Sequence, residues 1–404
     1  MPTLLSVNNY HYVRGGAEAV FLAHNDTFSR AGWEVVPFCM QHDDNLPSVW
    51  SEQFIDEIEL GKNYRFIERL RKSISAMYSW EGQKKIGRLL REIKPDLAHC
   101  HNIYHHISPS ILSTLSKKGV PTLLTVHDLK LACPAYRMIT HDGICERCKA
   151  GKLYNAARHR CMHGSMALSL WVTVEAYLHK LLRSYDKYVD RFISPSQFYI
   201  DKFEEWGWAK DCFTHIPNFV EAETIRPEFR PGSLFVYFGR LSREKGLATF
   251  IRASVDAGVS IQIIGTGPEE SNLKSLASQL DARVEFPGFV TGDALFDRLR
   301  AARAIVLPSE WYENAPISLL EAYATGKPVI GANIGGIPET ITEERGRTFE
   351  AFSTDSLAKV LTEINEMPDV DVGQMGQNAR SYVLDVHSRQ SYLDKCRSVY
   401  ESLL

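Results

Sequence analysis

Short apolar runs alternate with helical patterns twice along the chain, and this alternation restricts the fold more than any other feature. The first series contains the runs "TLLSV", "EVVPFC", "DLAHC", "PTLLTV" and "RFISP". The second contains "SLFVYFG", "SIQIIG", "RVEFPGF", "AIVLPS" and "KPVIGA". Such alternation is typical of βαβ units, in which helices cover a parallel sheet. We therefore predict an α/β fold with two doubly wound, Rossmann-like domains that face each other across a cleft.

The stretch "IPNFVEAETIRPEFRPGS" separates the two series and is rich in proline and polar residues, as linkers are. A length of 404 residues also suits two domains. The expected boundaries are an N-terminal domain over 1–217, a linker over 218–232 and a second domain over 233–375. Residues 376–404 are expected to be helical and able to pack back on the first domain.

Charge is distributed unevenly although the formal net charge is only −3. Residues 1–217 hold 27 Lys+Arg against 23 Asp+Glu, the remainder holds 19 against 26, and residues 62–200 hold 23 against 10. This pattern suggests an anionic partner for the first half, such as a membrane surface, a lipid phosphate or a nucleic acid; a solvated basic face is the alternative. Tyr64–Lys94 mixes aromatic and basic residues, as a helix pair resting on lipid headgroups would.

No secretory signal and no apolar run of about 18 residues is apparent, so we expect a cytoplasmic protein, with peripheral contact at the inner face of a membrane. "MALSLWVTVEAYLHKLL" is interrupted by Glu175 and His179 and is interpreted as an amphipathic or buried helix.

Two carboxylates lie eight residues apart in "EWYENAPISLLEAYATGKPVI". Glu313 follows a strand, Pro316 suits the start of a helix, and Glu321 lies in the first turns of that helix. Both acids can therefore face one ligand. Carboxylates accept several hydrogen bonds and suit the vicinal hydroxyls of sugars and ribose, whereas a lone acid would be interpreted as a solvated helix charge.

Cations follow the first strand of the second series in "YFGRLSREKGL". Arg240 and Lys245 lie just beyond the carboxyl end of that strand, next to Gly239, and can bind phosphate oxygens; two surface cations are the alternative. Glycines also precede expected helices, where bare backbone N–H groups bind anions or approach a nucleotide. These candidates are Gly15, Gly16, Gly265 and Gly267.

Two histidines lie near strand ends in the first series. His127 and Asp128 end "TVHDL", and His101 lies in "HCHNIYHH". A lone histidine is more often structural than catalytic, but a position at the sheet edge favours a functional role. We expect His101 and Asp128 on the acceptor side.

These elements together resemble a known family. The segments "RGGAE", "TVHD", "IPNFVE", "FGRLSREKGL", "IIGTGPEE" and "PSEWYENAPISLLEAYATGKPVIGANIGGIPE" are similar to those of the retaining glycosyltransferases of family 4, which have the GT-B fold. The resemblance covers most of the chain, and its most specific part is the pair of glutamates followed by "GKPVI" and "GGIPE". It implies transfer of a sugar from a UDP- or GDP-sugar donor with retention of anomeric configuration, onto a saccharide or lipid-linked saccharide, in bacterial surface polysaccharide synthesis.

The resemblance also implies roles for single residues. Glu313 is expected to contact the hydroxyls of the donor sugar, and Glu321 those of the ribose. Arg240 and Lys245 are expected to hold the diphosphate with help from the Gly16 amide, and His127 to lie at the reacting face. Those cations can stabilise the leaving group without a metal.

The chain departs from the family pattern directly after the first glutamate. Many members have an aromatic residue and glycine there, whereas this sequence has "ENAP". Asn314 and Ala315, before Pro316, are left to supply backbone contacts to the donor. The lone D-x-D, Asp369–Asp371, is interpreted as a loop far from the motifs.

Four cysteines cluster in an insertion over 133–163. Cys133, Cys145, Cys148 and Cys161 have the spacing C-x11-C-x2-C-x12-C. Four thiolates suit tetrahedral zinc in a reducing compartment, while two disulfides and free thiols are the alternatives.

Two other functions are weighed against glycosyl transfer. A nucleotide-sugar epimerase or hydrolase would keep the fold but need no acceptor. A zinc-containing nucleic-acid-binding protein would use the cysteines and the basic stretch, but the negative net charge and the paired glutamates disfavour it, and no nucleic acid is expected as a partner.

Overall fold

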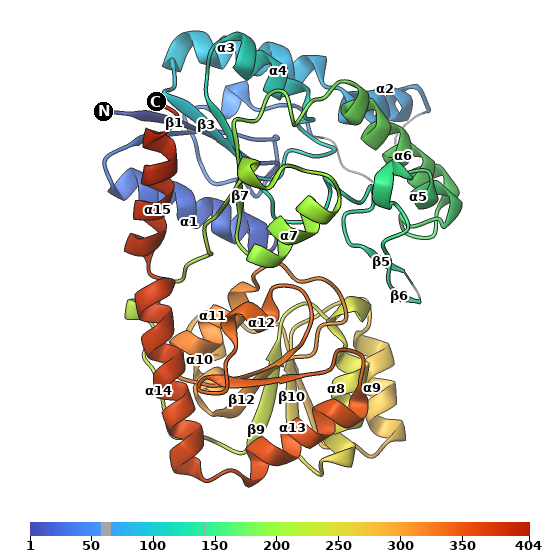
Figure 1. The fold of residues 1–404 in the computed structure, drawn as a ribbon, viewed down its shortest axis with the longest axis vertical. Helices are drawn as coiled ribbons and strands as arrows, with labels where there is room; N and C mark the ends of the chain where they lie inside the picture. Colours follow the sequence, from blue (N-terminus) through green and yellow to red (C-terminus); the bar gives the residue numbers. More distant parts are fainter. Residues whose placement is uncertain (58–65, 141) are drawn as a thin grey trace.

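The computed structural model describes residues 1–57, 66–140 and 142–404, and within them the chain forms two α/β lobes (Figure 1). Each lobe has a six-stranded sheet among these described residues, and all neighbouring strands in it run parallel. Helices cover the sheets, as the alternation of apolar strands and helices requires. The predicted α/β fold with two Rossmann-like domains is confirmed.

The N-lobe is the lobe built on the first sheet, whose strand order is β2-β1-β3-β4-β7-β8. Its strands are β1 (Thr3–Val7), β2 (Glu34–Phe38), β3 (Leu97–Cys100), β4 (Thr122–Thr125), β7 (Arg191–Ser194) and β8 (Phe213–His215). Its helices are α1 (Gly16–Arg30), α2 (Phe66–Met77), α3 (Trp80–Ile93), α4 (Ser110–Lys117), α5 (Asn155–Arg158), α6 (Met166–Leu181) and α7 (Gln197–Glu205). The cysteine-rich insertion adds a separate hairpin of β5 (Ile139–Thr140) and β6 (Gly143–Ile144).

The C-lobe is the lobe built on the second sheet, whose strand order is β11-β10-β9-β12-β13-β14. Its strands are β9 (Leu234–Phe238), β10 (Ile261–Ile264), β11 (Val284–Gly288), β12 (Ala302–Leu307), β13 (Val329–Ala332) and β14 (Gly346–Phe349). Its helices are α8 (Leu247–Asp256), α9 (Glu270–Gln279), α10 (Gly292–Arg300), α11 (Ile317–Ala324), α12 (Ile337–Thr340), α13 (Thr354–Glu366) and α14 (Asp369–Val386). The predicted D-x-D loop is wrong, because Asp369 begins α14 and pairs with Arg303 at 2.8 Å.

In each sheet the order in which the chain adds strands reverses once, and the point of reversal positions the site. In the N-lobe the chain proceeds outward from β1 to β2 and then returns past β1 to β3. In the C-lobe it proceeds from β9 through β10 to β11 and returns past β9 to β12. A crevice forms beyond the carboxyl ends of two strands that flank such a point, and ligands bind there. The loops after β9 and β12 therefore define the expected ligand site of the C-lobe.

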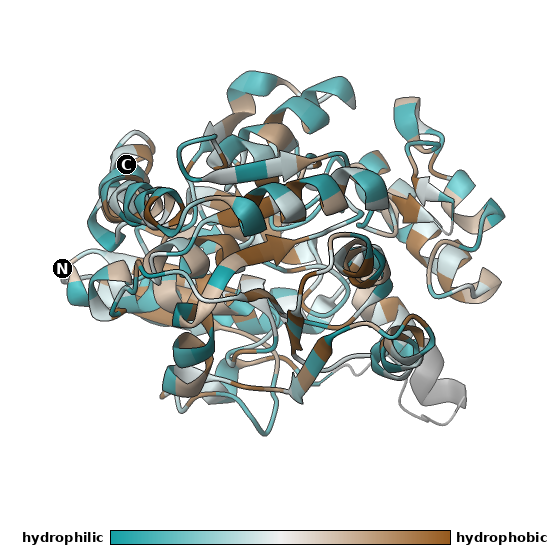
Figure 2. Cartoon of the chain, turned by 90° about the horizontal axis from the view of Figure 1, so that it is seen from below, coloured by the Kyte–Doolittle hydropathy of each residue, from teal (hydrophilic) through white to brown (hydrophobic). Residues whose placement is uncertain are grey.

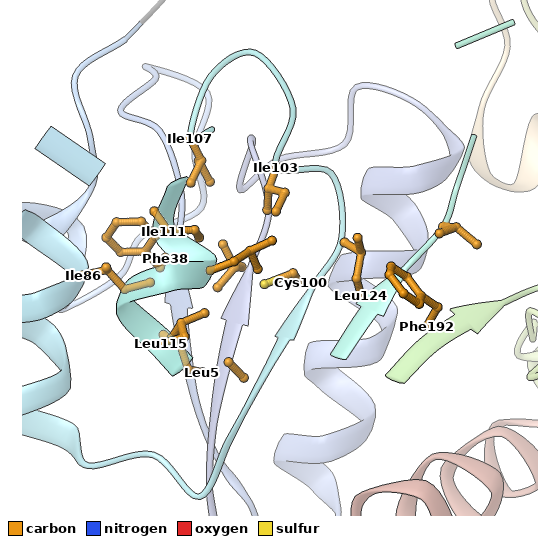
Figure 3. Packing of buried hydrophobic residues seen from close by; sticks show 14 of the residues in the cluster. Leu5, Phe38, Ile86, Cys100, Ile103, Ile107, Ile111, Leu115, Leu124 and Phe192 are labelled. Carbon is orange, nitrogen blue, oxygen red and sulfur yellow. The ribbon is translucent and has the colours of Figure 1, made fainter. Parts of the chain in front are cut away.

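The strands form the apolar interior, and polar residues collect on the outer helices (Figure 2). In the N-lobe core, Ile86 of α3 packs toward Phe38 and Ile111 (Figure 3). Leu89 and Leu90 of α3 are buried in the same core. The apolar face of α3 is therefore not free to rest on lipid, which corrects that expectation for this part of residues 64–94; residues 64–65 and the side chains of 66–70 lie outside the description.

The last helix returns to the N-lobe. Helix α14 packs beside α11 in the C-lobe, and α15 (Arg389–Glu401) packs beside α1 (Figure 1). Four side chains of α15 join the buried cluster that contains strand residues Leu4, Leu97, Leu123 and Ile193; they are Tyr392, Leu393, Cys396 and Tyr400. The C-terminal segment thus completes a core whose other buried members come from residues 4–219.

Candidate active site

The loops after β9 and β12 bring Lys245 and Glu313 into contact. Lys245 Nζ lies 2.6 Å from Glu313 Oε1, and the Ser309 hydroxyl donates to the same oxygen at 2.7 Å. Lys245 Nζ also lies 5.3 Å from the centre of the Trp311 ring. Sixty-eight residues separate the two charged groups in sequence, and the crevice beside β9 and β12 joins them.

The Glu313 carboxyl is held as an anion. Burial opposes its ionisation, but the Lys245 ammonium and the hydrogen bond from Ser309 outweigh burial and lower the pKa of Glu313. The carboxylate still has acceptor capacity for ligand hydroxyls. The pair therefore presents one fixed anion and one half-buried cation at the mouth of the crevice.

Two glycines after β13 allow this loop to approach. A side-chain Cβ at Gly335 would lie 2.4 Å from the Glu313 carbonyl oxygen, and one at Gly336 would lie 2.0 Å from that of Asn314. The Gly336 N–H donates to the Glu313 carbonyl at 2.9 Å. Neither these two glycines of "GGIPE" nor Ser309 was expected at the site, because a close backbone approach leaves no signal in the sequence alone.

The "ENAP" step links the two lobes. Asn314 Nδ2 donates to the Val126 carbonyl at 2.8 Å, and Asn314 Oδ1 accepts from the Ser196 hydroxyl at 2.7 Å. The Ala315 carbonyl accepts from Asn218 Nδ2 at 2.9 Å. The Asn314 side chain is thus used within the protein. Among the described residues, the backbone N–H groups of Asn314 and Ala315 have no acceptor, so these amides, beside Pro316 at the start of α11, are the groups left for a donor.

Glu321 lies on α11 and is half-buried. Burial raises the pKa of its carboxyl to about 7. Within the described part of the chain it has no hydrogen-bond partner or ion pair, so its oxygens remain available to a ligand. The two glutamates therefore differ in charge state: Glu313 is stabilised as an anion, whereas the Glu321 carboxyl is partly protonated at pH 7.

The other residues predicted in this lobe divide into exposed and packing positions. Arg240 is exposed, and Gly239 before it has a φ of 145°. A Cβ at Gly265 would lie 1.9 Å from the Gly239 carbonyl oxygen, and one at Gly267 would lie 2.2 Å from that of Leu241. Gly265 and Gly267 thus let the loop after β10 pack on the loop after β9. In the N-lobe, Gly15 precedes α1, and a Cβ at Gly16 would meet open space.

His127 and His101 meet at the edge of the N-lobe sheet. His101 Nδ1 lies 2.9 Å from His127 Nε2. Burial lowers the pKa of His127 to about 4, and burial together with neighbouring histidines lowers that of His101 well below its usual value, so both rings are neutral at pH 7. His101 Nε2 is buried without a partner among the described residues. An unpaired N–H costs more than an unpaired acceptor, so we assign the shared proton to His101 Nδ1, which leaves the His127 proton on Nδ1.

A polar network behind these rings was not predicted. His99 Nδ1 lies 2.6 Å from the Tyr400 hydroxyl, His99 Nε2 lies 2.7 Å from the Thr125 hydroxyl, and the His99 and His101 rings are stacked. His24 contacts the hydroxyls of both Tyr392 and Tyr400. Asp128 accepts from the Lys130 N–H at 2.9 Å, and burial raises its pKa to about 6. Residues remote in sequence thus support the His127 edge.

The four cysteines of the insertion form no disulfide among the described residues, and they lie near one another. Burial, followed by the neighbouring Cys133, Cys161 and Cys145, raises the pKa of Cys148 to about 12. Among the described residues, the group whose ligand atoms all lie within 4.8 Å of one another consists instead of His24, His99 and His101. The nitrogens of His24 and His99 are already bonded to hydroxyls, so that group is a hydrogen-bond network. Near the insertion's thiols, Glu146 Oε1 accepts from the Tyr312 hydroxyl at 2.9 Å, beside Glu313.

Two facing Rossmann-like lobes with a polar site between them define the GT-B class, and structural comparison agrees. A sucrose-phosphate synthase from Thermosynechococcus elongatus superposes with a TM-score of 0.73 at 18% identity, over 100% of this chain and 99% of that one. Anabaena Alr3699/HepE in complex with UDP-glucose gives a TM-score of 0.67 at 16% identity, over 99% of each chain. At such identities the likeness concerns the fold.

Sequence comparison identifies the family. A family model described as "Glycosyltransferase Family 4" matches residues 14–224, and one described as "Glycosyl transferases group 1" matches residues 223–382. The chain belongs to glycosyltransferase family 4.

Relatives of stated activity are distant. A UDP-Gal:alpha-D-GlcNAc-diphosphoundecaprenol alpha-1,3-galactosyltransferase of Escherichia coli is 24% identical over 388 residues, 89% of each chain. A GDP-mannose-dependent monoacylated alpha-(1-6)-phosphatidylinositol monomannoside mannosyltransferase of Corynebacterium glutamicum is 27% identical over 227 residues, 50% of this chain and 59% of that protein. The match thus spans less than two thirds of the latter relative's length.

Proposed function

We propose that this protein transfers a sugar from a nucleoside-diphosphate donor to a saccharide or lipid-linked saccharide, with retention of anomeric configuration. The observation that carries the proposal is the contact between Lys245 and Glu313 in the C-lobe. Next to it, the Asn314 side chain binds the Val126 carbonyl of the N-lobe, directly before His127. The pair of Lys245 and Glu313 offers a cation for phosphate and an anion for sugar hydroxyls. The relatives include transferases whose names specify UDP- and GDP-linked donors, so both are proposed as donors.

In the proposed reaction, the bond between the anomeric carbon and the phosphate oxygen breaks, and its electron pair stays with the nucleoside diphosphate. Arg240, Lys245 and the free amides before α11 stabilise that developing charge, so the reaction needs no metal. The acceptor hydroxyl attacks the same face, and its proton passes to the departing phosphate oxygen. Glu313 orients the sugar hydroxyls, Glu321 the ribose, and His127 Nδ1 donates a hydrogen bond at the reacting face.

The test is a thermal-shift screen of the purified protein against UDP- and GDP-sugars, followed by nucleoside-diphosphate release with and without saccharide acceptors. We expect one donor to stabilise the protein and acceptor to stimulate release. Equal release without acceptor would instead support a hydrolase, and interconversion of the nucleotide sugar an epimerase. Binding to DNA or RNA that weakens with salt, with no nucleotide-sugar turnover, would support the nucleic-acid-binding alternative.

A further inference from the structure

Helix α6 presents an apolar stripe to the outside of the N-lobe. Met166, Leu170, Val174, Tyr177 and Leu181 recur at steps of four, four, three and four residues, so they lie on one helix face. These five side chains, named here the α6 stripe, are between 38% and 81% exposed. Helix α6 lies at the outer edge of the lobe, beside α2 and α5 (Figure 1). A contiguous exposed apolar row of this length indicates an interaction surface.

The inner face of the same helix is polar and fixes its orientation. Buried Glu175 binds Lys130 at 2.8 Å and His105 at 3.0 Å. Buried His179 contacts the Ser184 hydroxyl at 3.0 Å and the Met77 carbonyl at 2.9 Å. A rotation of α6 that buried the stripe would break the contacts of Glu175 and His179. It would also leave buried charges unpaired. The stripe is therefore held outward by the interior of the protein.

Exposed cations lie on the segments next to the stripe and are named here the basic rim. Tyr177 of the stripe donates to the Gly151 carbonyl at 3.1 Å, so the loop and short helix α5 that follow Gly151 lie alongside it. The exposed cations of residues 147–187 are Arg147, Lys149, Lys152, Arg158, Arg160, Lys180, Arg183 and Lys187. Against them, Asp186 is the one exposed acid of that range, all of which the structure describes, and it pairs with Arg183. Exposed acids outside the range pair with Arg147 and Lys149, which leaves the other five cations without an acidic partner in the described part of the chain.

We propose that the α6 stripe and its basic rim dock the N-lobe on the surface of an anionic lipid bilayer, with the stripe in the interfacial region. Apolar side chains on one helix face with cations beside them are what such a surface binds. A second copy of the chain is a poorer occupant, because two basic rims would then face each other. Within the described residues, no helix has the length and hydropathy needed to cross a bilayer, so the contact is with the surface.

This inference goes beyond glycosyl transfer and does not depend on it. It also relocates the lipid contact from the predicted region 64–94 to α6. Glu175 on the inner face of α6 accepts a hydrogen bond from the Lys130 ammonium. The Lys130 backbone N–H in turn donates to Asp128, which follows His127 in the sequence. Docking through α6 would therefore bring the His127 edge of the N-lobe near the headgroups.

The test is flotation of the purified full-length protein with vesicles of equal parts phosphatidylcholine and phosphatidylglycerol, and with vesicles of phosphatidylcholine alone. We expect the wild type to bind the anionic vesicles and to release as salt rises. The double variant Leu170→Glu with Leu181→Glu should lose at least about tenfold in partitioning, and Arg158→Glu with Arg160→Glu a comparable amount.

The matched control is Val49→Glu with Val370→Glu, which adds the same charge at two exposed apolar positions outside α6. It should bind as the wild type does. Light scattering and thermal unfolding of each variant establish that the fold and oligomeric state are unchanged. Failure of the wild type to bind, or binding by the Leu170/Leu181 variant as strong as the wild type's, would overturn the proposal. A wild-type dimer that this variant dissociates would also overturn it, because a second copy would then cover the stripe.

Discussion

The two sides of the cleft are built from the chain in opposite ways. The C-lobe side is built from one continuous segment, residues 309–336, and from the loop after β9, all within the C-lobe. The N-lobe side uses α1, β3, β4 and α15, so that His24, His99 and Tyr400 meet from opposite ends of the sequence. The C-lobe site is thus a local construction, whereas the His127 edge depends on the whole chain. Their difference predicts which changes destroy structure and which destroy only chemistry.

Deletion of α15 should have the largest effect. A chain that ends at His387 lacks Tyr392, Leu393, Cys396 and Tyr400, which fill the N-lobe cluster. Each large buried side chain contributes roughly 2–5 kcal/mol, so their joint loss rivals the total stability of a domain. We expect the N-lobe to unfold and become protease-sensitive while the C-lobe persists in limited proteolysis. A chain ending at Glu401 is the matched control; equal resistance of both truncations would contradict the comparison.

Acid should destabilise the N-lobe first. Burial lowers the pKa of His24 to about 3 and that of His127 to about 4, whereas an unfolded histidine titrates near 6.5. The unfolded state therefore binds more protons below about pH 6.5, and the free energy of unfolding falls as pH drops from there toward the folded pKa values. The loss is on the order of 2 kcal/mol for each such histidine at about pH 5.

Urea denaturation at stepped pH checks this expectation, with Tyr400 and Tyr392 environments followed by near-UV circular dichroism. The variant His24→Gln should flatten the acid limb of the profile. A profile unchanged by that variant would show that the network is not the acid-sensitive element.

Glu313→Gln and Lys245→Ala should remove chemistry while the fold remains. Each deletes half of the 2.6 Å pair at the crevice. Loss of one preorganised charge at a developing anion costs about 10²–10³ in kcat. Turnover of nucleotide sugar and far-UV circular dichroism separate activity from folding. The control is Glu310→Gln. It removes a carboxylate that lies three residues before Glu313 and accepts a hydrogen bond from the Thr249 hydroxyl. Near-native turnover in either site variant would refute the assignment.

The cysteine insertion should bind zinc and respond to its removal. Its four thiols lie near one another in a segment that holds a two-stranded hairpin and the short helix α5, and four thiolates suit structural zinc. We expect elemental analysis to give about one zinc per chain. Cys148→Ser should lower Tm by about 2–6 °C, while Cys212→Ser should not. Metal-free protein with eight titratable thiols would show that the cysteines are free. Metal-free protein with disulfides would show that the four cysteines pair with one another.

The pH dependence of nucleotide binding should be the smallest effect. The pKa of Glu321 is raised to about 7 by burial, so the acid is largely protonated at pH 6. If its carboxylate accepts ribose hydroxyls, affinity should rise about tenfold between about pH 6 and pH 8 and then level off. Isothermal titration with nucleoside diphosphate measures this, and Glu321→Gln should abolish the slope. An equally steep slope in Glu321→Gln would assign it to another group.

The same contrast explains what sequence could predict. Strand–helix alternation determined both sheets, and the positions of Lys245 and Glu313 after strands were enough to expect them at one crevice. The Asn314 link to Val126 depends on how two lobes dock, which no local pattern encodes. The periodicity of α6 was visible, but Glu175 and His179 would conventionally mark its outer face. Only their contacts with buried Lys130 and with the Met77 carbonyl show that the face is reversed.

The return of α15 has a consequence for biosynthesis. The ribosome releases the strands of the N-lobe first, whereas Tyr392 and Tyr400, which close its cluster, are translated only after all the strands of the C-lobe sheet. At about 5–20 residues per second, the nascent N-lobe waits roughly 10–40 s after β8 before those side chains arrive. During that interval the surface formed by Leu4, Phe28 and Leu97 lies open. The nascent chain should therefore be a chaperone substrate until α15 leaves the exit tunnel.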